Sequence, residues 1–107
     1  MEELEKLYQL VASRKECPEE GSYTSYLLEK GAEKILKKVG EESTEVVLAA
    51  MKRDSEELVM EISDLLYHLV VLMAEQGITW QQVNDELAKR AQKTGNRKAE
   101  RREVTQL

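Results

Sequence analysis

Apolar residues along most of the chain recur at the spacing of α-helices. The first such set consists of Leu4, Leu7, Tyr8 and Val11. It predicts a short amphipathic helix over residues 2–13. The segment RKECPEEGS then breaks the pattern with the only proline and predicts a loop. A second short helix is predicted to open near Ser22 and to end at Gly31.

Two long helical patterns follow, joined near Arg53. The first covers residues 32–52, and a capping-box spacing of Asp54 with Glu57 starts the second, which runs to Gln76 with Gly77 as its stop. Thr79 and Gln82 have the same capping-box spacing, which predicts a last helix from Trp80 to about Thr94. The sequence shows no strand-like alternation, so the predicted class is all-α.

The helix predicted after Asp54 is apolar around most of its circumference. One side carries Leu58, Ile62, Leu65, Leu69 and Leu72, while other directions carry Val59, Leu66 and Val70. A helix of this kind is buried on several sides. The remaining helices of a 107-residue chain can hardly enclose it. We therefore expect a helical bundle completed by homodimerisation, with this helix at its centre.

Composition and charge narrow the class of function. The net charge is −5 with 35% charged residues, which argues against general nucleic-acid binding. Cys17 is the only cysteine, so no intrachain disulfide is expected and a cytoplasmic location is predicted. The longest apolar run, residues 65–74, is about half of the ~20 residues that cross a bilayer, so no membrane partner is expected.

The chain is predicted to form one domain over residues 1–95, followed by a charged tail over residues 96–107. The tail is either a solvated, frayed terminus or a lid over a substrate site. The domain contains neither a P-loop motif nor a GxGxxG motif, so those two modes of nucleotide binding have no support.

Four acids stand at mirrored positions about Arg53. Glu42 and Glu45 are three residues apart, and so are Glu61 and Asp64, which puts each pair on one helix face. Glu42 also shares its face with apolar positions of its own helix. If the chain turns at Arg53 into an antiparallel hairpin, the four carboxylates meet along an apolar seam.

An acidic face in a Glu-rich chain is commonly solvated or salt-bridged, but these acids lack the usual partners. Glu45, Glu61 and Asp64 have no Lys or Arg three or four positions away. A partly buried carboxylate without a counter-charge is unfavourable, and a divalent cation would neutralise the cluster. An all-oxygen donor set suits Mg²⁺, Mn²⁺ or Ca²⁺ better than zinc, and no EF-hand loop is present.

A Mg²⁺ site would indicate a phosphate-containing substrate, because protein-bound Mg²⁺ usually coordinates substrate phosphates. Lys34 and Lys38 lie one turn apart and could bind phosphate oxygens, although ordinary surface lysines remain an alternative. His68 follows Asp64 by one turn, within reach of a hydrogen bond. It is more simply a satisfied core histidine, and Tyr67 and Trp80 are most simply packing residues.

The order of the motifs resembles a known superfamily. E-E-x-x-E at Glu41 to Glu45 and E-x-x-D at Glu61 to Asp64 are similar to motifs of the MazG-like all-α nucleoside triphosphate pyrophosphohydrolases. Together with SYT, KILKKVGEE and DLLYH, they resemble the phosphoribosyl-ATP pyrophosphatase family over roughly residues 4–92.

The resemblance implies a homodimeric, ATP-binding hydrolase of histidine biosynthesis that uses Mg²⁺. The expected reaction converts phosphoribosyl-ATP to phosphoribosyl-AMP and pyrophosphate, with a separate phosphoribosyl-AMP cyclohydrolase as the next enzyme. The metal ligands would be Glu42, Glu45, Glu61 and Asp64. The resemblance makes Glu41 a catalytic base or an outer-sphere residue. It makes Lys34 and Lys38 phosphate binders, and Ser22 and Thr24 part of the substrate pocket.

Three positions depart from the family pattern. Ser43 and Ser63 stand where alanine is frequent, and Tyr26 stands where a basic residue is frequent, which puts one phosphate contact in doubt. Two rival functions stay open on the sequence. One is a housekeeping hydrolase of abnormal dNTPs, and the other is a non-catalytic helical dimer that serves as an adaptor.

Overall fold

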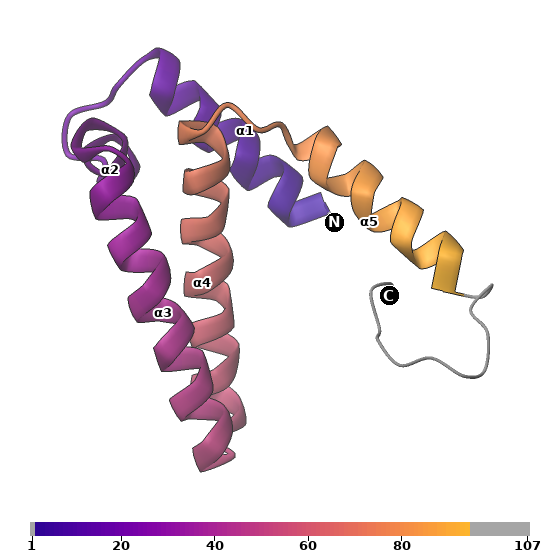
Figure 1. The fold of residues 1–107 in the computed structure, drawn as a ribbon. Helices are drawn as coiled ribbons and strands as arrows, with labels where there is room; N and C mark the ends of the chain where they lie inside the picture. The colour runs from indigo at the N-terminus through magenta and orange to yellow at the C-terminus, as the bar shows by residue number, and fades with distance from the viewer. Residues whose placement is uncertain (1, 95–107) are drawn as a thin grey trace. The chain divides into compact units, whose positions relative to one another are not determined.

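The computed structural model describes residues 2–94, which contain five α-helices and no strand. The helices are α1 (Glu2–Glu16), α2 (Tyr23–Lys30), α3 (Ala32–Lys52), α4 (Ser55–Glu75) and α5 (Trp80–Thr94) (Figure 1). The predicted all-α class is confirmed. The chain divides into two compact units between Gly77 and Ile78, and the predicted tail of residues 96–107 lies outside the described residues.

Side chains close the helix N-termini as the sequence predicts. The Asp54 carboxylate accepts a hydrogen bond from the Glu57 N–H at 3.1 Å, which caps α4. Thr79 and Gln82 form a reciprocal pair, with the Gln82 N–H 3.1 Å from the threonine hydroxyl and the Thr79 N–H 2.8 Å from the glutamine oxygen. Each cap satisfies backbone donors that a helix start leaves free.

Helix α1 ends at Glu16, three residues later than the predicted end at residue 13. The segment after Val11 lacks apolar periodicity, but Pro18 is the residue that stops the helix because it restricts the conformation of the residue before it. Two basic residues in the last turn suit the negative end of the helix dipole. One of them, Lys15, also donates a 2.8 Å hydrogen bond to the Ala74 carbonyl at the end of α4.

Helices α3 and α4 form a long antiparallel hairpin (Figure 1). The connection is short because Arg53 adopts the left-handed conformation, with φ of 58°, and Asp54 immediately caps the next helix. The Arg53 N–H donates to the Ala50 carbonyl at 3.1 Å and closes α3. The turn predicted at Arg53 and Asp54 is therefore confirmed.

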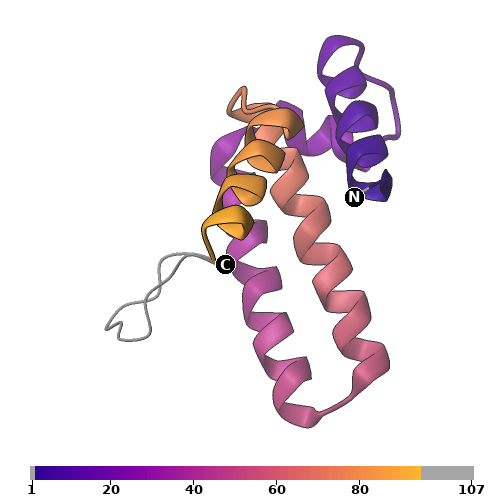
Figure 2. The same cartoon turned by 90° about the vertical axis from the view of Figure 1, so that its right-hand side faces the viewer.

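The buried core lies at the end of the hairpin far from this turn. Its fully or nearly fully buried side chains are Val11, Leu27, Ile35, Val70, Val71 and Ala74. Helices α1 and α2 pack there, whereas the half of the hairpin near the turn extends beyond them (Figure 2). Large apolar side chains of that half are exposed, including Met51 at 76%, Met60 at 65% and Val59 at 64%.

The second unit contributes α5, an amphipathic helix with a shallow apolar pocket of about 400 Å³ along Val83 and Leu87. Among residues 2–94, no helix combines the length and the apolar character needed to span a bilayer.

Candidate metal and phosphate site

Three of the four predicted acids meet across the α3–α4 hairpin. Glu42 of α3 and Glu61 and Asp64 of α4 each offer a carboxylate oxygen, and these oxygens all lie within 4.8 Å of one another. The antiparallel course brings Glu42 to the level of the α4 pair, and the three-residue spacing turns Glu61 and Asp64 to one face. We call this group the acid cluster.

Glu45 lies outside the 4.8 Å group but close enough to affect it. The pKa of Glu61 is raised above its ordinary value, first by partial burial and then by the charges of Glu45, Glu42, Asp64 and Glu57. Among these charges, Glu45 has the largest effect. The fourth predicted carboxylate therefore stands within electrostatic reach of the other three.

One lysine faces the acid cluster. The Lys38 ammonium lies 3.5 Å from a Glu41 carboxylate oxygen and 3.7 Å from one of Glu42. Partial burial alone would lower the pKa of Lys38, but Tyr23, Glu41 and Glu42 together raise it. Within residues 2–92, no ion pair joins a basic side chain to Glu45, Glu61 or Asp64, so negative charge is left in excess.

The donor chemistry of the acid cluster fits a hard divalent cation. Every candidate ligand atom is a carboxylate oxygen, which Mg²⁺ and Mn²⁺ prefer. The only histidine does not add a nitrogen ligand, because Nδ1 lies 2.8 Å from the Asp64 backbone carbonyl and Nε2 lies 3.1 Å from the Tyr23 hydroxyl. The only cysteine, Cys17, is exposed and lies outside the cluster.

His68 connects the acid-bearing helix to α2. A carbonyl oxygen can only accept, so Nδ1–H donates to the Asp64 backbone carbonyl, and Nε2 is hydrogen-bonded to the Tyr23 hydroxyl at 3.1 Å. His68 is 5% exposed. His68 lies within hydrogen-bond distance of Asp64 as predicted, but the bond is to the backbone carbonyl of Asp64 and not to its carboxylate. His68 thus fixes the position of Tyr23.

The predicted substrate-pocket residues Ser22 and Thr24 are engaged inside the protein. The Ser22 hydroxyl caps α2 by accepting from the Ser25 N–H at 3.1 Å. Thr24 is buried, and its hydroxyl is hydrogen-bonded to that of Tyr67 on α4. Together the two residues hold the first turn of α2, which carries Tyr23. Nothing in the sequence pattern singles out Tyr23, although it belongs to the SYT motif.

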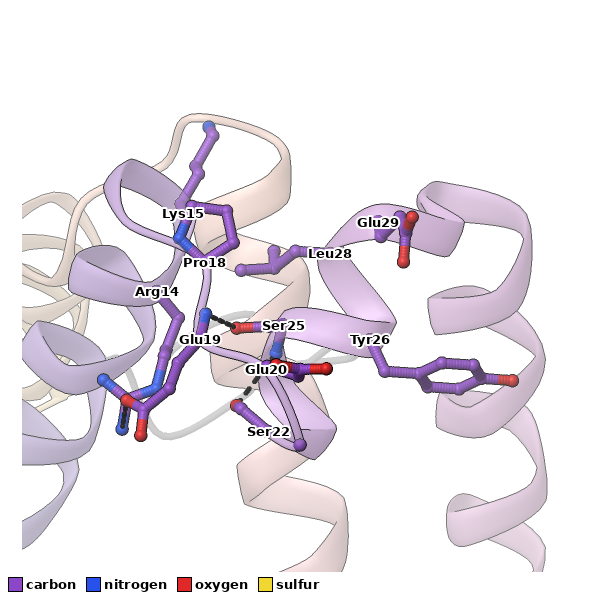
Figure 3. A pocket seen from close by; sticks show the side chains of 11 residues that line it. Arg14, Lys15, Pro18, Glu19, Glu20, Ser22, Ser25, Tyr26, Leu28 and Glu29 are labelled. Carbon is purple, nitrogen blue, oxygen red and sulfur yellow. Dashed lines mark hydrogen bonds and ion pairs between the residues drawn. The ribbon is translucent and has the colours of Figure 1, made fainter.

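Ser22 also borders a pocket of about 570 Å³ formed by the end of α1, the following loop and α2 (Figure 3). An ion pair of Arg14 with Glu19 at 3.1 Å crosses one side of it. Tyr26 leaves α2 on the opposite side, as Figure 3 shows. No member of the acid cluster lines this pocket.

The two predicted phosphate binders are separated by the structure. Lys38 pairs with the acids, whereas Lys34 lines a different pocket of about 500 Å³ between α2 and α3. Helical spacing places the two lysines on neighbouring turns, but their surroundings differ because α2 packs beside the first of them.

Comparisons with known proteins agree with the motifs. Residues 4–91 match the family model described as phosphoribosyl-ATP pyrophosphohydrolase. A phosphoribosyl-ATP pyrophosphatase of Limosilactobacillus fermentum is 59% identical over 90 residues, covering 84% of this chain and 85% of the relative. One of Lactiplantibacillus plantarum is 50% identical over 107 residues, covering 100% of both chains.

A longer relative matches in part. The histidine biosynthesis bifunctional protein HisIE of Caldanaerobacter subterraneus is 54% identical over 93 residues, which cover 87% of this chain and 45% of the relative. The family model spans most of the described helices and every residue of the acid cluster. The chain therefore belongs to the phosphoribosyl-ATP pyrophosphohydrolase family of enzymes.

Proposed function

We propose that this protein hydrolyses phosphoribosyl-ATP to phosphoribosyl-AMP and pyrophosphate, the second step of histidine biosynthesis, in the cytoplasm. The observation that supports this most directly is the acid cluster, whose oxygens lie within 4.8 Å of one another in a chain that belongs to the family. Such a cluster suits the binding of a metal–triphosphate complex.

The residues that would hold Mg²⁺ are Glu42, Glu61 and Asp64, with Glu45 as the fourth ligand. Glu45 is included because its charge acts on Glu61. Bound Mg²⁺ would neutralise phosphate charge and make a coordinated water more acidic. The four carboxylates from α3 and α4 would in turn fix the position of the ion relative to the substrate.

Glu41 and Lys38 would act on the water and the phosphate oxygens. Glu41 is exposed and would accept the proton of the water whose oxygen attacks phosphorus, while the anhydride bond to pyrophosphate breaks. Lys38, 3.7 Å from Glu42, would donate hydrogen bonds to the triphosphate oxygens. Ser22, Thr24 and His68 would support the site by holding Tyr23 in place.

A second copy of the chain would cover the exposed half of the hairpin. The apolar side chains of Val47, Leu48, Met51, Val59 and Met60 lie there between 49% and 76% exposed. Several large apolar side chains exposed in one region are typical of a protein interface. A homodimer formed through α3 and α4 would bury it.

The product would pass to a separate phosphoribosyl-AMP cyclohydrolase. Support for this coupling comes from HisIE of Caldanaerobacter subterraneus, which is named as bifunctional and of which this chain matches 45%.

The direct test incubates the protein with phosphoribosyl-ATP and Mg²⁺, detects pyrophosphate, and traces labelled water oxygen into one of the two products. Mg²⁺-dependent release is expected, with little activity toward a panel of dNTPs. A strong dNTP preference would support the housekeeping hydrolase instead. A lack of any Mg²⁺-dependent release would support the adaptor.

A further inference from the structure

A pocket of about 500 Å³ between α2 and α3 concentrates positive charge. Its lining consists of Tyr26, Lys30, Glu33, Lys34 and Lys37. We call it the lysine pocket. Its volume falls in the range of small-molecule sites, which is about 300–1,000 Å³.

The three ammonium groups of the lysine pocket are not neutralised by neighbouring acids. Within residues 2–92, Lys30, Lys34 and Lys37 form no ion pair, whereas Lys38 on the next turn has two. Glu33 is the only acid in the lining. Three like charges around one hollow are unfavourable together, and an anion bound between them would relieve this repulsion.

Tyr26 forms one wall of the lysine pocket. The Lys30 ammonium lies 5.8 Å from the centroid of the Tyr26 ring, a distance at which the ring attracts a cation. The contact holds a flexible lysine beside the hollow. Tyr26 thus holds one ammonium group at the pocket without being basic itself.

The lysine pocket and the acid cluster lie along the same helix at a distance that a nucleotide can span. Lys34 precedes Glu42 by eight residues, which corresponds to about 12 Å along α3. Tyr26, which lines the lysine pocket, stacks on Tyr23 with ring centroids 6.1 Å apart, and both residues are at least 40% exposed. Exposed aromatic faces of this kind can stack against a base.

We propose that the lysine pocket binds a phosphate monoester, namely the phosphate of the phosphoribosyl group of phosphoribosyl-ATP. This inference rests on the proposed function for the identity of the substrate. The triphosphate would lie at the acid cluster, and the phosphoribosyl phosphate would lie among Lys30, Lys34 and Lys37. Each ammonium offers three donors and no acceptor, which matches the oxygens of a phosphate monoester.

This arrangement gives the site a means of selecting its substrate. ATP carries the triphosphate but not the phosphoribosyl group, so it would leave the lysine pocket unfilled. Lys34 is partly buried, whereas Lys30 and Lys37 are exposed. A site whose charged groups bind one part of a substrate discriminates against an analogue that lacks that part. The lysine pocket therefore determines specificity, while the acid cluster acts on the bond that breaks.

The test replaces the three lysines with glutamine, as Lys30→Gln, Lys34→Gln and Lys37→Gln in one chain. We expect KM for phosphoribosyl-ATP to rise roughly 100-fold with little change in kcat, because contacts made equally in the ground and transition states affect binding alone. A matched control removes three charges elsewhere, as Lys6→Gln, Lys52→Gln and Lys89→Gln, and should keep KM within about twofold.

A binding measurement separates this inference from the proposed function. Ribose 5-phosphate, with ribose as the uncharged control, is titrated into the wild-type and triple-variant proteins without Mg²⁺ while backbone amide shifts are recorded. Shifts around the lysine pocket in the wild type alone support the inference, even if the wild type releases no pyrophosphate and the proposed function is wrong. An active wild type whose triple variant keeps KM and shows the same shifts overturns the inference and leaves the function intact.

Discussion

The two ends of the α3–α4 hairpin differ in how their apolar side chains are used. At the end far from the turn, Ile35 and Val71 are fully buried beneath α1 and α2. At the end near the turn, Met51 and Val59 are more than 60% exposed. The same pair of helices therefore forms a closed core at one end and an open apolar surface at the other.

The acid cluster lies between these ends, and beyond it toward the turn only the small side chain of Ala49 is fully buried among the described residues. On α3, Glu42 falls between the buried Ile35 and the exposed Met51. On α4, Glu61 and Asp64 fall between the exposed Val59 and the buried His68. The packed helices α3 and α4 hold the three carboxylates close together, while Glu42 and Glu61 are only partly buried and Asp64 is exposed.

The largest expected effect concerns the acids at this boundary. Glu61→Ala or Asp64→Ala should lower kcat/KM for phosphoribosyl-ATP by at least about 1,000-fold, because each removes a charge that would hold Mg²⁺. Mg²⁺ should also raise the Tm of the wild type and leave that of the variants unchanged. Glu56→Ala, which removes an exposed acid in the first turn of α4, is the control. A variant with near wild-type turnover would refute the assignment.

The next effect concerns the open end. Val59→Asp places a charge on the exposed apolar surface and should raise the dimer dissociation constant by at least about 100-fold, because burying an unpaired charge is unfavourable. Light scattering after size-exclusion chromatography would measure the mass. Lys52→Gln, at the same end, makes the same one-unit change of net charge and is the control. A wild-type protein that is monomeric at all concentrations would show that the open end is not a dimer interface.

Shortening an apolar side chain to alanine should lower the free energy of unfolding more at the closed end than at the open end. Ile35→Ala removes a fully buried side chain and should cost about 2–4 kcal/mol of unfolding free energy. Leu48→Ala, where the side chain is 49% exposed, should cost less than about 1 kcal/mol in dilute protein. Urea denaturation at low protein concentration measures both. Equal losses would contradict the difference between the two ends.

The smallest effect concerns Gly40, which lies inside α3 near the boundary. A Cβ built there meets nothing within 4 Å, so neither close packing nor a positive φ requires glycine. Gly40→Ala should stabilise the protein by about 0.5–1 kcal/mol through helix propensity. Gly31→Ala is the matched contrast, since Gly31 has φ of 88° and alanine would be strained there. Thermal denaturation should therefore show shifts of opposite sign.

Local signals in the sequence were sufficient to predict the helices and the turn, except for the end of α1, which lies three residues later than predicted. Asp54 with Glu57, and Thr79 with Gln82, predict helix starts because capping depends on residues three apart. The mirrored spacing about Arg53 likewise predicts the meeting of Glu42 with Glu61 and Asp64. These features depend on helix geometry and on one turn, both of which can be derived from the residue order.

Features that depend on packing between helices were not predictable in the same way. The engagement of Thr24 with Tyr67, and of His68 with Tyr23, requires knowing that α2 lies beside α4. The separation of Lys34 from Lys38 depends on where α2 covers α3. Gly40 is a further example, because the residue order alone does not show that α3 continues through it with no close neighbour at the Cβ position.

Because the connection at Arg53 is so short, the number of residues in each arm of the hairpin determines which side chains of α3 and α4 face each other. With one left-handed residue and one cap between α3 and α4, the number of residues from Glu42 to Glu61 sets how the carboxylates meet. A single residue inserted between Glu45 and Arg53 would rotate Glu42 by about 100° relative to the turn and aim it away from its partners. The site is thus encoded in the length of a segment as much as in the identity of its acids.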